Sequence, residues 1–123
     1  KGHLAALHSG QPGSLALRPG VAYTGDGSAQ LGVLPGRYTV YASRGFEYSV
    51  AQKQVTVAVG ETAVVPLEIR REVPTPNLVA CDTHIHTLTF SGHGDSTTEE
   101  RMLTIAGEGI EFRDGDWYPG RSR

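Results

Sequence analysis

Residues 35–42 read PGRYTVYA, a Pro-Gly turn signal followed by aromatic and β-branched residues. Such residues favour a pleated, half-buried strand, so the stretch predicts a β-strand over residues 37–42. Alternating or short apolar runs recur before and after it. They predict further strands at residues 46–50, 55–59 and 63–70, with weaker candidates at residues 15–17, 21–23 and 31–34.

Short strands at this spacing are typical of antiparallel sandwiches. We therefore expect residues 1–73 to form a small antiparallel β-sandwich that holds most of the ordered core. Pro66 has no backbone N–H to donate, which predicts a sheet edge or a bulge for the strand at residues 63–70. Residues 74–77, Pro-Thr-Pro-Asn, disfavour helix and predict an extended linker.

The pattern of apolar and polar residues changes after the linker. Residues 78–81, Leu-Val-Ala-Cys, form an apolar run typical of a strand buried on both faces, with Cys81 as a buried small hydrophobe. A helix follows, capped by Thr97 or Thr98 and ended by glycines. Its apolar face is supplied by Met102, Leu103, Ile105 and Ala106. Strand, loop and helix predict a βα unit within residues 78–111.

An irregular tail is expected over residues 112–123, because Asp114 and Asp116 stand where a second buried strand would belong. The predicted fold is mainly β: a small antiparallel β-sandwich followed by the first βα unit of a truncated (βα) barrel. A whole barrel needs roughly 200 residues or more. The chain is therefore expected to be a fragment of a longer protein or the product of a displaced reading frame.

Two histidines, His84 and His86, carry the strongest chemical signal. Side chains two apart on a strand point to the same face, so both imidazoles can reach one metal ion, with Asp82 on that face as a supporting carboxylate. His93 follows in the next loop, where a solvent-exposed histidine and a further ligand are both open. Asp95 is expected to cap the loop or the helix.

Composition excludes some other functions. The chain has 123 residues, 11 of them basic and 13 acidic, so its net charge of −2 gives no reason to expect nucleic acid as a partner. One cysteine excludes an internal disulfide. No apolar run approaches the ~18 residues of a membrane span, and the residues from Lys1 onward show no charged-then-apolar leader, so no targeting segment is visible.

A family resemblance joins these motifs. Asp82-Thr83-His84-Ile85-His86-Thr87, Ser91-Gly92-His93-Gly94-Asp95, and the helix start Thr97-Thr98-Glu99-Glu100-Arg101 resemble the opening of a PHP-type metal-dependent hydrolase. The closest likeness is to the carbaryl-hydrolase-like CehA/McbA branch, and it covers about residues 78–111. Residues 34–48 are similar to the carboxypeptidase-regulatory-like β-sandwich that precedes some of these hydrolases.

The resemblance implies a function for the parent protein. It would hydrolyse a phosphoester, ester or carbamate of a small-molecule substrate, using water activated by divalent zinc, manganese or iron. His84 and His86 would be metal ligands, Asp82 would support them, and His93 is a further candidate. The family's later Thr-Asp-His motif is absent, so the site is incomplete and the chain alone is expected to be inactive. An extracytoplasmic location is compatible with the resemblance.

Two other interpretations stay open. The chain is alternatively a non-catalytic β-sandwich that packs domains together or attaches to a surface, with residues 78–123 as an incomplete hydrolase remnant. A fragment of the wider amidohydrolase superfamily is a third interpretation, because those enzymes also open their barrel with a His-x-His motif.

Overall fold

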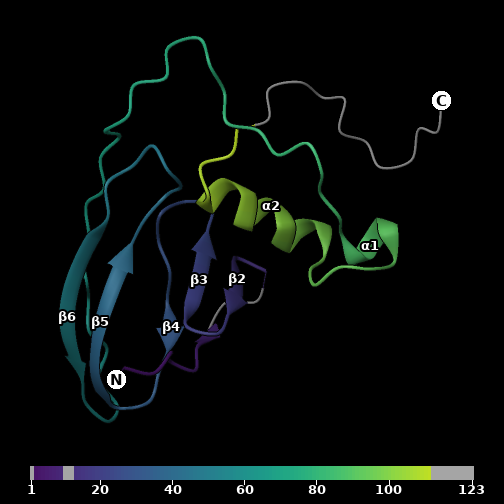
Figure 1. Cartoon of the computed structure of the whole chain (residues 1–123). Coiled ribbons are helices and arrows are strands. Elements are labelled where there is room, and N and C mark those ends of the chain that lie inside the picture. The colour runs from purple at the N-terminus through teal and green to yellow at the C-terminus, as the bar shows by residue number, and fades with distance from the viewer. Residues whose placement is uncertain (1, 10–12, 112–123) are drawn as a thin grey trace.

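The computed structural model of the chain describes residues 2–9 and 13–111 (Figure 1). Within this part the fold is mainly β and contains no barrel. Its strands form three separate two-stranded antiparallel sheets. They pair β1 (His8–Ser9) with β4 (Leu31–Gly32), β2 (Leu15–Arg18) with β3 (Val21–Thr24), and β5 (Gly36–Ala42) with β6 (Ala51–Val57).

The longest sheet is the β5–β6 pair, and it confirms the strand predicted over residues 37–42. Tyr38 lies opposite Val55, and burial alternates along β5 so that Tyr38, Val40 and Ala42 are half-buried. Aromatic and β-branched residues at these positions cover one face of the pair. The strand predicted over residues 55–59 begins earlier and ends at Val57.

Two predicted strands are not formed, at residues 46–50 and 63–70. The segments meet at a single bridge between Tyr48 and Arg71 and through a few hydrogen bonds, among them Ser49 N–H to the Arg70 carbonyl at 2.8 Å. Gly45 adopts φ +62° just before the first segment, which turns the chain out of an extended path. Pro66 removes a donor from the second, so a continuous ladder does not form.

The apolar run at residues 78–81 is also not a strand, and its prediction as a buried one is wrong. Leu78 is 69% exposed and Val79 48%, and Cys81 is exposed. Asn77 has φ +63°, and the Leu78 N–H closes a turn on the Thr75 carbonyl at 3.2 Å. A strand buried on both faces needs neighbouring strands for its backbone groups. Within the described residues this run instead has the turn at Leu78 and one bond from the Glu111 N–H to the Ala80 carbonyl at 2.8 Å.

The predicted helix is confirmed as α2 (Thr98–Gly107), with Thr97 as its N-cap. The Thr97 hydroxyl accepts from the Glu100 N–H, and the Glu100 carboxylate accepts from the Thr97 N–H, each at 3.3 Å. This reciprocal capping box satisfies two donors that every helix start leaves unpaired. A second, short helix, α1 (Leu88–Ser91), was not expected from the pattern. Neither helix is long and apolar enough to cross a membrane, nor is any other in the described residues.

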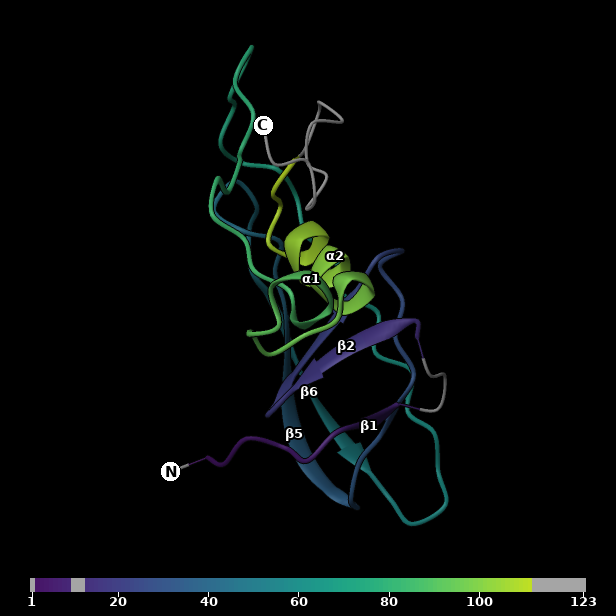
Figure 2. The same cartoon turned by 90° about the vertical axis from the view of Figure 1, so that its right-hand side faces the viewer.

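The core lies where α2 packs on the β2–β3 hairpin (Figure 2). Among the described residues, the buried apolar side chains are Leu15 and Ala16 of β2 and Ile105 of α2. Gly107 lies so close to β3 that a Cβ there would be 2.7 Å from the Tyr23 ring. The small core is therefore shared between the strand-rich segment and α2, whereas we expected most of it within residues 1–73. The tail expected at residues 112–123 lies outside the described residues.

Candidate metal centre

His84 and His86 lie in an extended loop between the apolar run at residues 78–81 and helix α1. Asp82 shapes the start of this loop, because its Oδ1 accepts the backbone N–H of His84 at 3.0 Å. A carboxylate that bonds the backbone two residues on forms a local turn. Asp82 thus holds the main chain at His84 and, within the described residues, makes no hydrogen bond to either imidazole ring.

The two imidazoles converge. The Nε2 atoms of His84 and His86 are 2.7 Å apart, with ring centroids 4.8 Å apart and planes inclined by 47°. Both side chains are exposed, so an ion from solvent can reach them. Two imidazoles bound tetrahedrally to zinc at 2.0–2.1 Å hold their nitrogens about 3.3 Å apart. At 2.7 Å the two nitrogens share a hydrogen bond, so one of them carries the proton. To bind zinc together they would have to give up that bond and separate by about 0.6 Å.

His93 joins the pair from the next loop. Its ring centroid lies 4.5 Å from that of His86, with the planes inclined by 39°. Gly92 adopts φ +68° at the end of α1 and turns the chain back toward the first two histidines. The three imidazoles therefore stand in a row, with His86 in the middle.

The loop from Thr87 to Ser96 is closed by its own hydrogen bonds. The Ser91 hydroxyl lies 2.6 Å from the Thr87 carbonyl and 2.9 Å from the His93 carbonyl, and its single proton is shared between these two acceptors. The Leu88 N–H donates to the Ser96 carbonyl at 2.9 Å, and both Thr87 and Ser96 are buried. These bonds fix the loop that presents His93.

A complete metal shell is not assembled here. No group of three or more His, Cys, Asp or Glu side chains in the described part of the chain is arranged to hold one ion. The ring contacts among His84, His86 and His93 do not contradict this, because neighbouring rings need not direct their nitrogens at one point. The arrangement offers two convergent imidazole nitrogens, with a third ring adjacent.

Asp95 does not join the histidines. Its Oδ1 lies 2.5 Å from Arg101 Nη2, and its Oδ2 lies 3.5 Å from Arg18 Nε. Burial works to raise the pKa of this carboxyl, but the charges of Arg101 and Arg18 outweigh it and lower the pKa. Sequence reasoning placed Asp95 at the loop and missed both arginines. Arg18 lies far away in the sequence, and no local spacing signals that β2 meets this loop.

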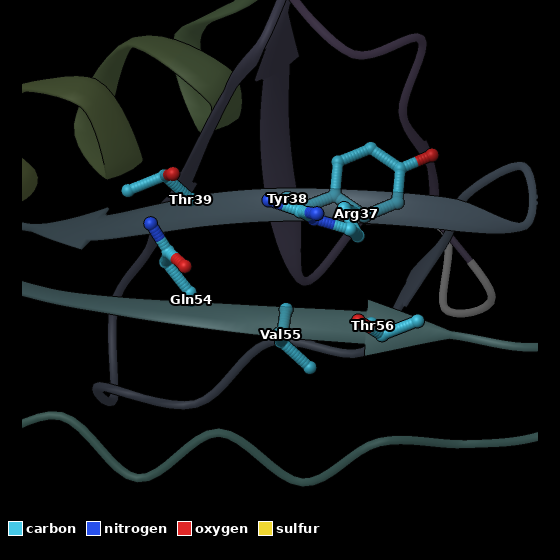
Figure 3. Close-up of a pocket in the computed structure, with 6 residues that line it drawn as sticks. All are labelled: Arg37, Tyr38, Thr39, Gln54, Val55 and Thr56. Atoms are coloured by element: carbon cyan, nitrogen blue, oxygen red, sulfur yellow. The ribbon is translucent and has the colours of Figure 1, made fainter.

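A shallow hollow lies elsewhere, on the β5–β6 pair (Figure 3). It is lined by Arg37, Tyr38, Thr39, Gln54, Val55 and Thr56. Neighbouring residues of a strand point to opposite faces, so these side chains do not converge on a common ligand as the imidazoles do. The histidine loop is the better candidate for a site.

Comparison of the chain with models of known protein families, with curated proteins and with solved structures found no match.

Proposed function

We propose that the chain carries the opening segment of a PHP-type metal-dependent hydrolase, preceded by a β-sandwich-like unit. The observation that carries this proposal is the convergence of the His84 and His86 Nε2 atoms at 2.7 Å. Residues 78–111 would then correspond to the first βα unit of the catalytic domain. Helix α2 supplies its helical part, and residues 78–81 would become a strand only when further strands pair with them.

In this function His84 and His86 hold a divalent ion through two neutral imidazole nitrogens. Asp82 keeps the backbone turn that sets their direction, and His93 stands beside them as a further donor. The bound ion would lower the pKa of a coordinated water and polarise the scissile group of a phosphoester, ester or carbamate. Imidazole suits zinc, manganese or iron.

Two imidazoles fill only part of a metal shell, since catalytic zinc sites take three protein ligands. The shell would then be completed by His93, if its ring turns toward the ion, or by donors from another part of the parent protein. The chain alone is expected to bind metal weakly and to hydrolyse no activated phosphoester above background. A non-catalytic packing module would instead need no metal at all, which separates the two interpretations.

Titration calorimetry of the full chain with zinc tests the proposal. Changing His84 and His86 together to alanine should abolish binding, whereas changing His3 and His8 together should leave it intact. Unchanged affinity after loss of His84 and His86 would overturn the metal-site proposal. A Thr-Asp-His motif encoded shortly after the Glu111 codon, in any frame, would favour the PHP-type hydrolase over an amidohydrolase.

A further inference from the structure

Asp95 occupies a junction between three parts of the molecule. It lies in the loop that presents His93, and two arginines from different elements meet its carboxylate. Arg18 comes from β2, with Nε 3.5 Å from Oδ2, and Arg101 comes from α2, with Nη2 2.5 Å from Oδ1. Figure 2 shows the loop after α1 and helix α2 lying together beside β2. One carboxylate thus joins the histidine loop to the strand-rich segment and to the helix.

Arg18 has contacts besides its pair with Asp95. Arg18 Nη1 donates to the Leu17 carbonyl at 2.7 Å and lies 3.8 Å from Glu100 Oε1. The side chains of Arg18 and Arg101 are only 27% and 26% exposed. The atoms Arg18 Nη2 and Arg101 Nε are buried and have no hydrogen-bond partner within the described residues. A guanidinium that is already fixed loses little freedom on pairing. The Asp95 side chain itself is 65% exposed, so these ion pairs bear on the position of the loop more than on stability.

The position of Asp95 is transmitted to His93 by a short, closed stretch of backbone. The Ser91 hydroxyl ties the His93 carbonyl to the end of α1, and the Ser96 carbonyl is tied to the Leu88 N–H. Asp95 lies between those two anchored points. A shift of Asp95 therefore shifts the His93 backbone, and the His93 ring lies against His86.

We propose that Arg18 is a positioning residue for the histidine site: through Asp95, strand β2 sets the place of the His93 loop beside His84 and His86. The strand-rich segment would then help to position the ligands of the metal site, in addition to lying next to it. This inference rests on the proposed function, because it concerns the same imidazoles.

The test uses the full chain and Co²⁺ as the probe, since its visible absorption reports ligand geometry. Arg18→Gln removes the charge and shortens the side chain but keeps a polar end, and Arg18→Lys restores the charge on a chain of similar length. The matched control is Arg70→Gln, which breaks an exposed ion pair with Glu68 away from the histidines. Circular dichroism confirms that each variant is folded.

We expect Arg18→Gln to weaken Co²⁺ binding about 3- to 10-fold and to shift the absorption band. Arg18→Lys should recover part of both effects, and Arg70→Gln should change neither. If the wild type binds Co²⁺ and Arg18→Gln binds it with the same affinity and the same absorption spectrum, the inference is overturned. The proposed function would remain.

If the wild-type chain binds no Co²⁺, that result counts against the proposed function and not against the positioning role of Arg18. A second measurement then tests the positioning role. Amide exchange of the metal-free chain then decides. Arg18→Gln should speed exchange within residues 91–96, and Arg70→Gln should not. Equal exchange rates in the wild type and Arg18→Gln would overturn the positioning role.

Discussion

The Tyr23 hydroxyl donates a hydrogen bond to Glu108 Oε1 at 3.1 Å. Tyr23 belongs to β3, and Glu108 is the C-cap of α2. The same ring covers Gly107. One tyrosine therefore joins the hairpin to the end of the helix, through its ring and through its hydroxyl.

This contact predicts an alkaline loss of stability. Burial, followed by the hydrogen bond and the negative charge of Glu108, raises the pKa of Tyr23 above its ordinary value of 10.0. Because the folded value is raised, the contribution to stability is complete below about pH 10 and is lost as the pH rises through the folded value. The melting temperature of the wild type should fall more steeply above pH 10 than that of Tyr23→Phe. Tyr41→Phe, at an exposed position, should show the same pH dependence of the melting temperature as the wild type. The prediction is contradicted if the melting temperature of Tyr23→Phe falls above pH 10 as steeply as that of the wild type.

Gly45 should tolerate no side chain. It has φ +62°, and an added Cβ would collide with the backbone carbonyl of Glu108. Gly27 is the matched control, because it has φ +82° and open space around it. Both alanine variants strain the backbone, but only Gly45→Ala must also displace α2, so it should cost about 1–3 kcal/mol more in urea unfolding. Equal urea midpoints for Gly45→Ala and Gly27→Ala would show that the backbone around Gly45 can move to accommodate the added Cβ at no extra cost.

Ile105 should be the most sensitive apolar position of α2. It is 7% exposed in the core, whereas Met102 on the same helix is 38% exposed. Ile105→Ala leaves a cavity beside β2 and should destabilise the chain by about 2–5 kcal/mol. Met102→Ala should cost clearly less. Thermal or urea melts of both variants measure the difference, and similar losses would place the core elsewhere.

Thr97 and Thr98 offer a paired test of the helix cap. The Thr97 hydroxyl accepts the Glu100 N–H at 3.3 Å, so Thr97→Ala should cost about 1 kcal/mol of stability. The Thr98 hydroxyl is buried and has no partner in the described part of the chain. Thr98→Ala should therefore lose no hydrogen bond and melt near the wild type. A larger loss for Thr98→Ala than for Thr97→Ala would reverse the assignment of the cap.

The sequence pattern correctly predicted the elements that are determined by residues close together in the chain. The strand at Gly36–Ala42 follows from its aromatic and β-branched residues, and the start of α2 follows from Thr97 and Glu100. The spacing of His84 and His86 predicted two rings on one face of a strand. The rings do lie close together, but the backbone there is a loop and not a strand end.

What the sequence could not predict depends on distant partners. The apolar run at Leu78–Cys81 has the composition of a buried strand, but no neighbouring strand pairs with it in the described residues. The packing of Ile105 against β2, and the meeting of Arg18 with Asp95, join segments far apart in the chain. No periodicity within either segment encodes such a meeting.

The exposure of Cys81 has a practical consequence for every metal measurement. It is the only cysteine of the chain, it is exposed, and it lies three residues before His84. Oxidation would link two copies at this point and place two His84–His86 pairs on one covalent dimer. Four imidazoles can close a tetrahedral shell that one chain leaves open. Affinity measured without a reductant would then describe the crosslinked dimer, and its stoichiometry of one ion per two chains would reveal the artefact.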